Sequence, residues 1–169
     1  QRFNIIVLHN GCDSQTRDVI RSFDSYRCNS IQYISHDPVS IAVQRNLALS
    51  MCKSPYIGFL DDDDTWHPDK VSHFYSWYES SSVSLIKQTS IWYSAAGFFT
   101  DYHHPVPTIT STISDPVRSF HQLILQKSQF TGSASNPILS INHCRLVNGY
   151  NESVVTGEDW ELYLRLAQF

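Results

Sequence analysis

The sequence lacks any long apolar run, and its start lacks the basic and apolar regions of a signal peptide. A helix that crosses a bilayer needs about 20 consecutive apolar residues, and a secretory signal joins a charged region to an apolar one. Both absences argue against a transmembrane or secreted chain. We therefore expect a cytoplasmic protein, and the sequence is also compatible with peripheral association at the inner face of the membrane.

Basic clusters and closely spaced cysteines are lacking as well. The net charge is -4 at pH 7 and no stripe of Lys and Arg occurs, which argues against general binding of nucleic acid. The four cysteines are widely spaced, without a Cys-x-x-Cys pair: Cys12, Cys28, Cys52 and Cys144. Such spacing is typical of reduced, mostly buried thiols rather than of a zinc site or a disulfide framework.

What the sequence does contain is the composition of an ordinary globular domain. It has 169 residues, of which 41% are hydrophobic and 17% are charged, and this is enough to bury a substantial core. We expect one domain over residues 1–169. The chain begins at Gln1 without a methionine and ends at Phe169 inside a helical pattern, so we expect a domain truncated at both ends.

Residues 55–70, with the sequence PYIGFLDDDDTWHPDK, contain the strongest functional pattern. The apolar run at 55–60 is typical of a strand buried on both faces of a parallel sheet. It ends in four consecutive aspartates at 61–64. Like charges about 4 Å apart repel by roughly 4 kcal/mol at an effective dielectric near 20. Four adjacent carboxylates therefore require a cation, protonation or wide exposure to water.

The alternation of side chains along a strand would place Asp61 and Asp63 on one side, as an Asp-x-Asp pair. Ligands bind at the carboxyl edge of open α/β sheets, and carboxylates suit Mg²⁺ or Mn²⁺ bridging to a phosphorylated substrate. The alternative is a solvated acidic turn that caps the next helix. We favour the metal-phosphate interpretation because a buried strand precedes the aspartates and Trp66 follows them.

The hydrophobic pattern predicts alternating strands and helices over residues 1–64. Helix-capping signals and apolar periodicity place strands at 3–8, 31–35 and 55–60, and helices at 14–26 and 41–52. Right-handed crossovers then predict an α/β fold, with a parallel sheet covered by helices on both faces. In the first helix we expect Val19, Ile20 and Phe23 to form the inner face.

The later elements are predicted from the same signals. They are a helix at 69–78, strands at 83–86 and 90–99, a surface loop at 103–114, a helix at 115–126, a small polar loop at 131–135, a strand at 137–141 and a helix after 157. The composition of the polar loop is that expected of a segment passing close to a ligand. The His103-His104 pair is interpreted as part of an exposed loop rather than as a metal site.

Glu158 and Asp159 form a second acidic centre at the start of the last predicted helix. The helix dipole favours a carboxylate there. For Asp159 alone, a plain helix cap is the preferred interpretation. Together, the two centres suggest that one holds a metal and a diphosphate while the other takes a proton from an incoming hydroxyl.

Several segments resemble the family 2 glycosyltransferases of the GT-A fold. The core signature is matched by Arg45-Asn46-Leu47-Ala48-Leu49, by YIGFLDDDDTW at 56–66 and by Pro68-Asp69-Lys70. GYNE at 149–152 resembles the family's Gly-Phe-Asp-Glu, and GEDWEL at 157–162 with Arg165 resembles its Glu-Asp-Trp-Asp-Leu segment. IIVLHNGC at 5–12 resembles the family's second strand and its Asp-Asp-Gly-Ser turn. The match covers nearly the whole chain.

The resemblance implies a Rossmann-like, mostly parallel sheet with helices on both faces. It also implies metal-dependent, inverting transfer of a sugar from a nucleotide-sugar donor to a hydroxyl acceptor. UDP-sugars are the default donors, Mn²⁺ or Mg²⁺ is the implied cofactor, and a saccharide or lipid-linked acceptor in polysaccharide or glycoconjugate synthesis is the implied partner. Residues 1–88 would form the donor-binding half and residues 89–169 the acceptor-binding half.

The resemblance also implies roles for individual residues. On the donor side Asp63 and Asp61 fall on the Asp-x-Asp motif as metal ligands, with Asp61 or Asp62 near the ribose and phosphate. Asp159 falls on the general base that deprotonates the acceptor, and Glu158 would shape the acceptor side.

Three further residues have two interpretations each. Arg45 would pair with phosphate or lie on the surface. Trp66 and Trp160 would wall the pocket or pack in the core.

The chain also departs from the family pattern at its start and end. Residues 3–8 match the family's second strand, so the first strand, which helps hold the base and ribose, has no counterpart. His9 stands where the family usually has Asp, and Asn10 where another Asp often contacts the base. The family's elements beyond the last helix have no counterpart either.

Two other functions are alternatives to the transferase. One is a catalytically inactive module that binds a nucleotide sugar, because fold alone does not establish activity. The other is a phosphatase of the haloacid-dehalogenase type, since Asp61-x-Asp63-x-Thr65 after an apolar strand matches its nucleophile motif. That motif normally follows the first strand and is accompanied by a downstream Lys and Gly-Asp-Asp pattern, neither of which is present here.

Overall fold

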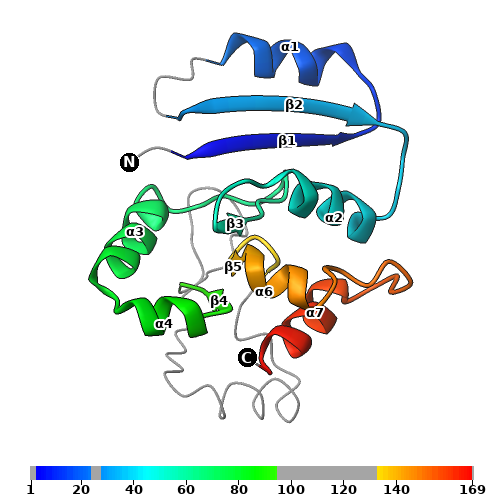
Figure 1. The fold of residues 1–169 in the computed structure, drawn as a ribbon. Coiled ribbons are helices and arrows are strands. Elements are labelled where there is room, and N and C mark those ends of the chain that lie inside the picture. Colours follow the sequence, from blue (N-terminus) through cyan, green and yellow to red (C-terminus); the bar gives the residue numbers. More distant parts are fainter. Residues whose placement is uncertain (1–2, 24–27, 95–132, 169) are drawn as a thin grey trace, which may run out of the picture.

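The computed structural model describes residues 3–23, 28–94 and 133–168. Helices and short strands are mixed throughout these residues (Figure 1), so the predicted α/β class is confirmed. The predicted loop 103–114, which contains His103 and His104, and the predicted helix 115–126 lie outside the described residues. The same holds for 95–99 of the predicted strand 90–99.

Two strands near the N-terminus form a parallel pair. β1 (Asn4–Asn10) and β2 (Ser30–His36) align along their whole length, and each extends slightly past its predicted end. α1 (Ser14–Ser22) lies beside β2 (Figure 1). The Asp13 side chain accepts a hydrogen bond from the Thr16 backbone nitrogen and so caps this helix. The sequence offered Asp13 and Ser14 as candidate caps, and the structure selects Asp13.

The face of α1 that was expected to be buried is exposed. Val19 is 67% exposed and Phe23 is 62% exposed, and α1 has no buried residue. A pair of strands offers a helix far less apolar surface than a wide sheet does. The predicted inner face is therefore wrong for Val19 and Phe23, whereas Ile20 is half-buried. Periodicity identifies an apolar face without showing that a partner covers it.

α2 (Ile41–Met51) connects the parallel pair to the rest of the domain. The Ser40 hydroxyl accepts a hydrogen bond from the Val43 nitrogen and caps the helix, and the Gln44 amide donates to the Leu8 carbonyl of β1 at 2.8 Å. The buried residues of α2 recur at helical spacing: Ala42, Arg45, Ala48 and Leu49. One of the four is an arginine, which the apolar pattern did not place inside.

The remaining strands form a second, antiparallel sheet in the order β3-β5-β4. β3 (Tyr56–Gly58) pairs with β5 (Ile138–Ser140), and β5 pairs with β4 (Ile91–Trp92). This differs from the parallel neighbour expected for residues 55–60. An apolar run identifies a buried strand but carries no information about which strand pairs with it.

Two helices follow the acidic segment, α3 (Lys70–Ser80) and α4 (Val83–Gln88). α3 confirms the helix predicted at 69–78 and buries Phe74. The strand predicted at 83–86 is wrong, because these residues belong to α4. The Ser82 hydroxyl caps α4 by accepting a hydrogen bond from the Leu85 nitrogen, and a short apolar run does not by itself distinguish a strand from a helix.

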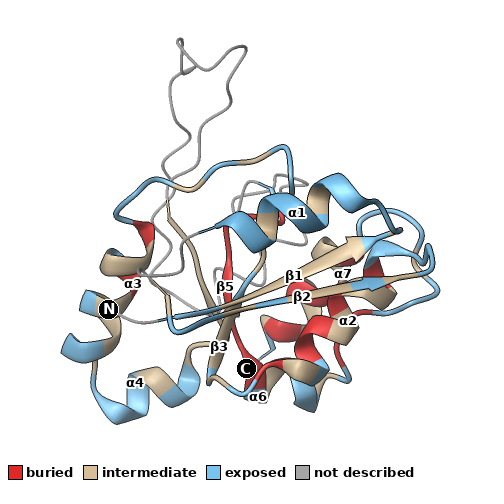
Figure 2. Ribbon diagram, turned by 90° about the horizontal axis from the view of Figure 1, so that it is seen from above, coloured by how far each residue is buried: buried red, intermediate tan, exposed pale blue. Residues whose placement is uncertain are grey.

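The core lies around β5, α2 and the last two helices, whose buried residues are red in Figure 2. The sequence did not predict α6 (Ile141–Leu146), which follows β5 directly, whereas α7 (Glu158–Leu166) confirms the helix after residue 157. The fully buried side chains include Leu139, Ile141, Cys144, Leu162, Tyr163 and Leu166. Cys52 and Cys144 are buried thiols, as predicted, whereas Cys12 is exposed and Cys28 is half-buried. None of the described helices has the length and apolar character to span a bilayer.

Candidate active site

The aspartates at 61–64 form a turn rather than the end of a strand. β3 ends at Gly58, and the Asp64 nitrogen donates to the Asp61 carbonyl at 3.2 Å. Asp62 and Asp63 occupy the exposed middle of the turn, while Asp61 and Asp64 are half-buried. The predicted strand alternation of Asp61 and Asp63 is therefore wrong. Aspartate favours turns, and exposure of the central pair to water limits the repulsion among the four charges.

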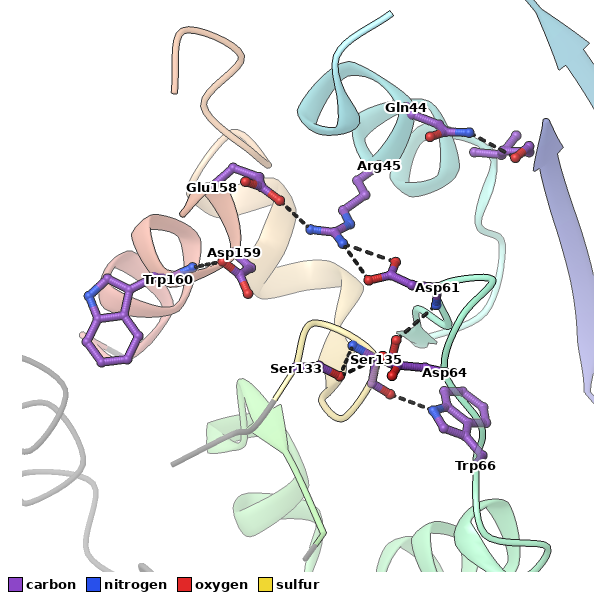
Figure 3. A network of polar contacts seen from close by, with 11 residues as sticks. Gln44, Arg45, Asp61, Asp64, Trp66, Ser133, Ser135, Glu158, Asp159 and Trp160 are labelled. Carbon is purple, nitrogen blue, oxygen red and sulfur yellow. Dashed lines mark hydrogen bonds and ion pairs between the residues drawn. The ribbon is translucent and has the colours of Figure 1, made fainter. Parts of the chain in front are cut away.

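A loop from a distant part of the sequence binds both ends of this acidic turn (Figure 3). The Ser135 hydroxyl accepts a hydrogen bond from the Asp61 nitrogen at 2.9 Å, and the Ser133 hydroxyl donates to the Asp64 carboxylate at 2.9 Å. Both serines belong to the small polar loop predicted at 131–135. Its position against the acidic turn agrees with the expectation that this loop lies near the site, although no individual contact was predicted.

Trp66 packs between the acidic turn and the same loop. Its indole nitrogen donates to the Ser135 carbonyl, and its ring lies against Gly58, where an added Cβ would come within 2.8 Å of the indole Cη2. Trp66 is half-buried, so packing accounts for its position. Contact with a donor stays a prediction.

Arg45 brings the two acidic centres together (Figure 3). Its Nη1 donates to Glu158 Oε1 at 2.7 Å, and its Nη2 lies 3.2 and 3.4 Å from the two Asp61 carboxylate oxygens. Arg45 is only 5% exposed and Glu158 only 8% exposed. The interpretation of Arg45 as a surface residue is wrong. Pairing with a phosphate stays a prediction, but the structure shows pairing with two carboxylates.

Asp159 lies next to Glu158 in the first turn of α7. Gly157 is the N-cap, with φ of 78°, so Asp159 is inside the helix and is not its cap. The Asp159 Oδ1 accepts a hydrogen bond from the Trp160 nitrogen at 2.7 Å. The helix dipole stabilises a carboxylate at this end. In Figure 3 the Trp160 ring points away from Arg45, and Asp159 lies on the α7 side of the site, with the acidic turn on the other side.

The turn before α7 is attached to α2 by Asn46. Its amide nitrogen donates to the Tyr150 carbonyl at 2.9 Å and to Glu152 Oε1 at 2.8 Å, and its amide oxygen accepts from the Tyr150 nitrogen at 2.7 Å. Gly149, with φ of 68°, passes close to this amide. The Arg45-Asn46 pair thus performs two tasks, since Arg45 binds the acidic centres and Asn46 holds the 149–152 turn.

Two buried tyrosines adjoin the site and were not predicted. Burial raises the pKa of both phenols, and the nearby Asp159 carboxylate raises it further. The hydroxyls of Tyr150 and Tyr163 have no hydrogen-bond partner within the described part of the chain. The GYNE segment indicated that residue 150 is near the site, but no pattern in the sequence assigned a role to either phenol.

Asn10 ties the end of β1 to the loop before α2. Its amide donates to the Val39 carbonyl at 3.0 Å and accepts from the Val39 nitrogen at 2.9 Å. The Asn10 amide thus satisfies both backbone hydrogen-bonding groups of Val39, as a neighbouring residue of a strand would. Contact of Asn10 with a nucleotide base stays a prediction.

Lys70 belongs to the Pro68-Asp69-Lys70 signature and is a buried cation to which the sequence assigned no role. Its Nζ donates to Asn136 Oδ1 at 2.7 Å and to the Ser94 hydroxyl at 3.0 Å, and it lies over the rings of Trp66 and Trp92. Burial lowers the pKa of Lys70 from 10.5 to about 8. Lys70 therefore helps to hold the 133–136 loop against the acidic turn.

The side chains available as metal ligands limit the kind of metal site that the acidic turn could form. Among residues 3–23, 28–94 and 133–168, no group of three or more His, Cys, Asp or Glu side chains is arranged to enclose a cation. Mg²⁺ is commonly held by one or two carboxylates together with substrate phosphates and water. The exposed carboxylate of Asp63 fits a site of this open kind, whereas the carboxylate of Asp61 is paired with Arg45.

Comparisons with known proteins identify the family of the chain. The chain is similar to the chondroitin synthase of Escherichia coli, with 25% identity over 161 residues. The match covers 92% of this chain and 21% of that protein, so the chain spans about one fifth of the relative's length. Residues 1–169 match the family described as glycosyltransferase like family 2. This whole-length match argues against the phosphatase interpretation, and the chain therefore belongs to glycosyltransferase family 2.

Proposed function

We propose that this domain transfers a sugar from a nucleotide-sugar donor to a hydroxyl group of a saccharide acceptor, with inversion at the anomeric carbon. The observation that carries the proposal is the contact of Arg45 with both Asp61 and Glu158, which brings the acidic turn and the start of α7 to one site. The chondroitin synthase relative supports a role in polysaccharide synthesis, and UDP-sugars are the donors to test first.

The acidic turn would form the donor side of the site. Asp63 and Asp61 would hold Mn²⁺ or Mg²⁺, which when bound would neutralise the charge that develops on the leaving diphosphate. Asp62, exposed beside them, would contact the ribose or phosphate. Trp66 and the serine-containing loop at 133–135 keep the turn in place through the hydrogen bonds described above.

The start of α7 would form the acceptor side. Asp159 would accept the proton of the acceptor hydroxyl as its oxygen attacks C1 of the donor sugar. A bond forms between this oxygen and C1, and the bond between C1 and the diphosphate oxygen breaks on the opposite face, so the configuration inverts. The diphosphate leaves with the electron pair, and the proton remains on Asp159.

Nucleotide titration followed by transfer assays tests the two sides separately. Calorimetry with UDP, GDP and dTDP, with and without Mn²⁺, should show metal-dependent binding of one nucleotide that Asp63→Ala abolishes. Asp159→Asn should keep that binding while transfer falls by about 10²- to 10⁴-fold, the usual range for loss of a general base. Asp18→Asn, an exposed change on α1, is the matched control and should alter neither.

Two outcomes would contradict the proposal. Binding of a nucleotide sugar without transfer or hydrolysis, across a panel of donors and acceptors, would support the inactive binding module. Equal transfer by Asp159→Asn and the unchanged protein would show that Asp159 is not the base.

A further inference from the structure

The guanidinium of Arg45 is buried and contacts acidic and aromatic side chains of the described residues. Its Nη1 donates to Glu158, its Nη2 faces Asp61, and the rings of Phe59 and Tyr150 lie 5.8 and 5.6 Å from its central carbon. With 5% of its surface exposed, Arg45 has little room to reorient toward a ligand. A planar group that contacts two adjacent rings and bonds two carboxylates is strongly preorganised.

The groups that meet at Arg45 come from elements far apart in the sequence. Arg45 belongs to α2, Asp61 to the turn after β3, and Glu158 to the first turn of α7. Asp61 adjoins the carboxylates assigned to the donor, and Glu158 directly precedes Asp159. The distance between the donor side and the proposed base therefore depends on one side chain that bridges them.

We propose that Arg45 is a positioning residue that sets the separation between the acidic turn and Asp159. The inference rests on the proposed function, and it gives Arg45 a role other than gripping the diphosphate. Misplacement of reacting groups by about 1 Å can cost roughly 100-fold in rate, so loss of the bridge should slow the transfer step more than it weakens donor binding.

The structure also explains why arginine is required at this position. A guanidinium presents donors in a fixed planar fork and can bond two carboxylates at once while its face packs near aromatic rings. A lysine at 45 would keep the positive charge but offer a single compact ammonium. Arg45→Lys should therefore preserve folding and electrostatics better than Arg45→Met, without restoring the geometry of the bridge.

Steady-state kinetics separate positioning from phosphate binding. In Arg45→Lys we expect kcat to fall about 100-fold, while the donor KM changes by less than about threefold, as for an interaction used in the transition state. Glu158→Gln should give a similar loss, and the double variant should lose little more than either single one, because the two residues act as a unit. A large rise in donor KM with additive losses would overturn the proposal in favour of a phosphate ligand.

Hydrogen exchange tests the bridge without any enzymatic activity. In Arg45→Lys and Arg45→Met, the amides of Glu161 and Asp64, which bond to Gly157 and Asp61, should exchange about tenfold faster through local opening. The amide of Ala167, which bonds to Tyr163 at the far end of α7, should not change. Equal acceleration of all three would indicate global destabilisation, and no acceleration would show that the bridge positions nothing; either result would overturn the proposal.

A second arginine provides the matched control. Arg145 donates to the Cys52 carbonyl and forms no ion pair with a carboxylate among the residues that the structure describes. Arg145→Met should therefore leave both kcat and the Glu161 amide unchanged. Suppose that transfer is absent for every protein and donor tested, while the Glu161 and Asp64 amides still exchange faster in Arg45→Lys. That result would contradict the proposed function and support the structural role of Arg45. The two failures are thus distinguishable.

Discussion

Residues 3–36 and residues 133–168 form two ends of the described structure, and their side chains are buried to different degrees. No described residue of the first region is buried, and its regular structure consists of a two-stranded ladder and one capped helix. The second region contains most of the core, including the fully buried Leu139, Ile141 and Leu162. Hydrogen bonds and caps organise the first region, whereas packing organises the second.

The difference places the two halves of the candidate site in different settings. Asp159 and Glu158 begin a helix whose inner face is part of the core. Asn10, the residue assigned to the nucleotide base, ends a strand in the exposed region and bonds only to the Val39 backbone in the described contacts. Local stability follows buried apolar contacts. We therefore infer that the proposed general base, Asp159, is held rigidly and that the β1–β2 strand pair is less stable. Four experiments test this contrast.

The largest effect should come from truncating the core of the second region. Leu162 in α7 is 0% exposed, so Leu162→Ala should lower the free energy of unfolding by about 2–5 kcal/mol, the range for a leucine cavity. Urea unfolding with far-ultraviolet circular dichroism measures it. A loss below about 1 kcal/mol would mean that Leu162 is not tightly packed, and the contrast between the two regions would not hold.

The next largest effect should come from the 149–152 turn, which precedes α7 and is attached to α2 by the Asn46 side chain. Gly149→Ala would force a side chain onto a backbone with φ of 68° and place its Cβ 2.5 Å from the Asn46 amide oxygen. Backbone strain of about 1–2 kcal/mol and the weakened Asn46 bonds should together cost roughly 2–3 kcal/mol. Gly157→Ala has a similar φ and no atom within 4 Å, so it should show the strain alone. Equal losses in the two variants would exclude the Asn46 contribution.

A smaller, pH-dependent effect should come from Lys70, which anchors the second region to α3. Its pKa is about 8 in the folded protein and 10.5 as the reference value. Between these values the unfolded chain binds more protons, so the contribution of Lys70 to stability rises with pH, by at most about 1.4 kcal/mol per unit.

The comparison with Lys70→Met isolates this contribution. We would measure the unfolding free energies of wild type and Lys70→Met in urea from pH 7.5 to 9.5. The wild type should become more stable relative to Lys70→Met as pH rises through about 8. The Cys144 thiol, whose pKa burial raises to about 12, destabilises both proteins equally above its reference value of 9.0 and cancels. A difference that stays flat with pH would show that Lys70 titrates normally.

The smallest effect should come from the exposed face of α1. Val19 is largely exposed and α1 has no buried residue, so Val19→Ser should change the free energy of unfolding by less than about 0.5 kcal/mol. The same urea assay measures it beside Leu162→Ala. A loss approaching that of the core variant would mean that this face is covered in solution, and the contrast between the two regions would not hold.

Much of the local structure was predictable because its signals lie within a few residues. Asp13 and Ser40 cap α1 and α2 through bonds to nitrogens three residues ahead, and such spacing can be read directly from a sequence. The 83–86 segment shows where this fails, since its apolar residues suit either element and the Ser82 cap decides for a helix. Family membership was also predictable, because the signatures around Arg45, the four aspartates and Glu158-Asp159 survive as short contiguous motifs.

The sequence by itself thus determined the family, the acidic centres and most helix starts. Only the tertiary structure decided that β3 pairs with β5, that the aspartates form a turn bound by Ser133 and Ser135, and that Arg45 meets Glu158, 113 positions away. Caps and apolar periods are set by neighbours along the chain. A buried ion pair depends instead on which distant segments the folded core brings together, and no local pattern records that choice.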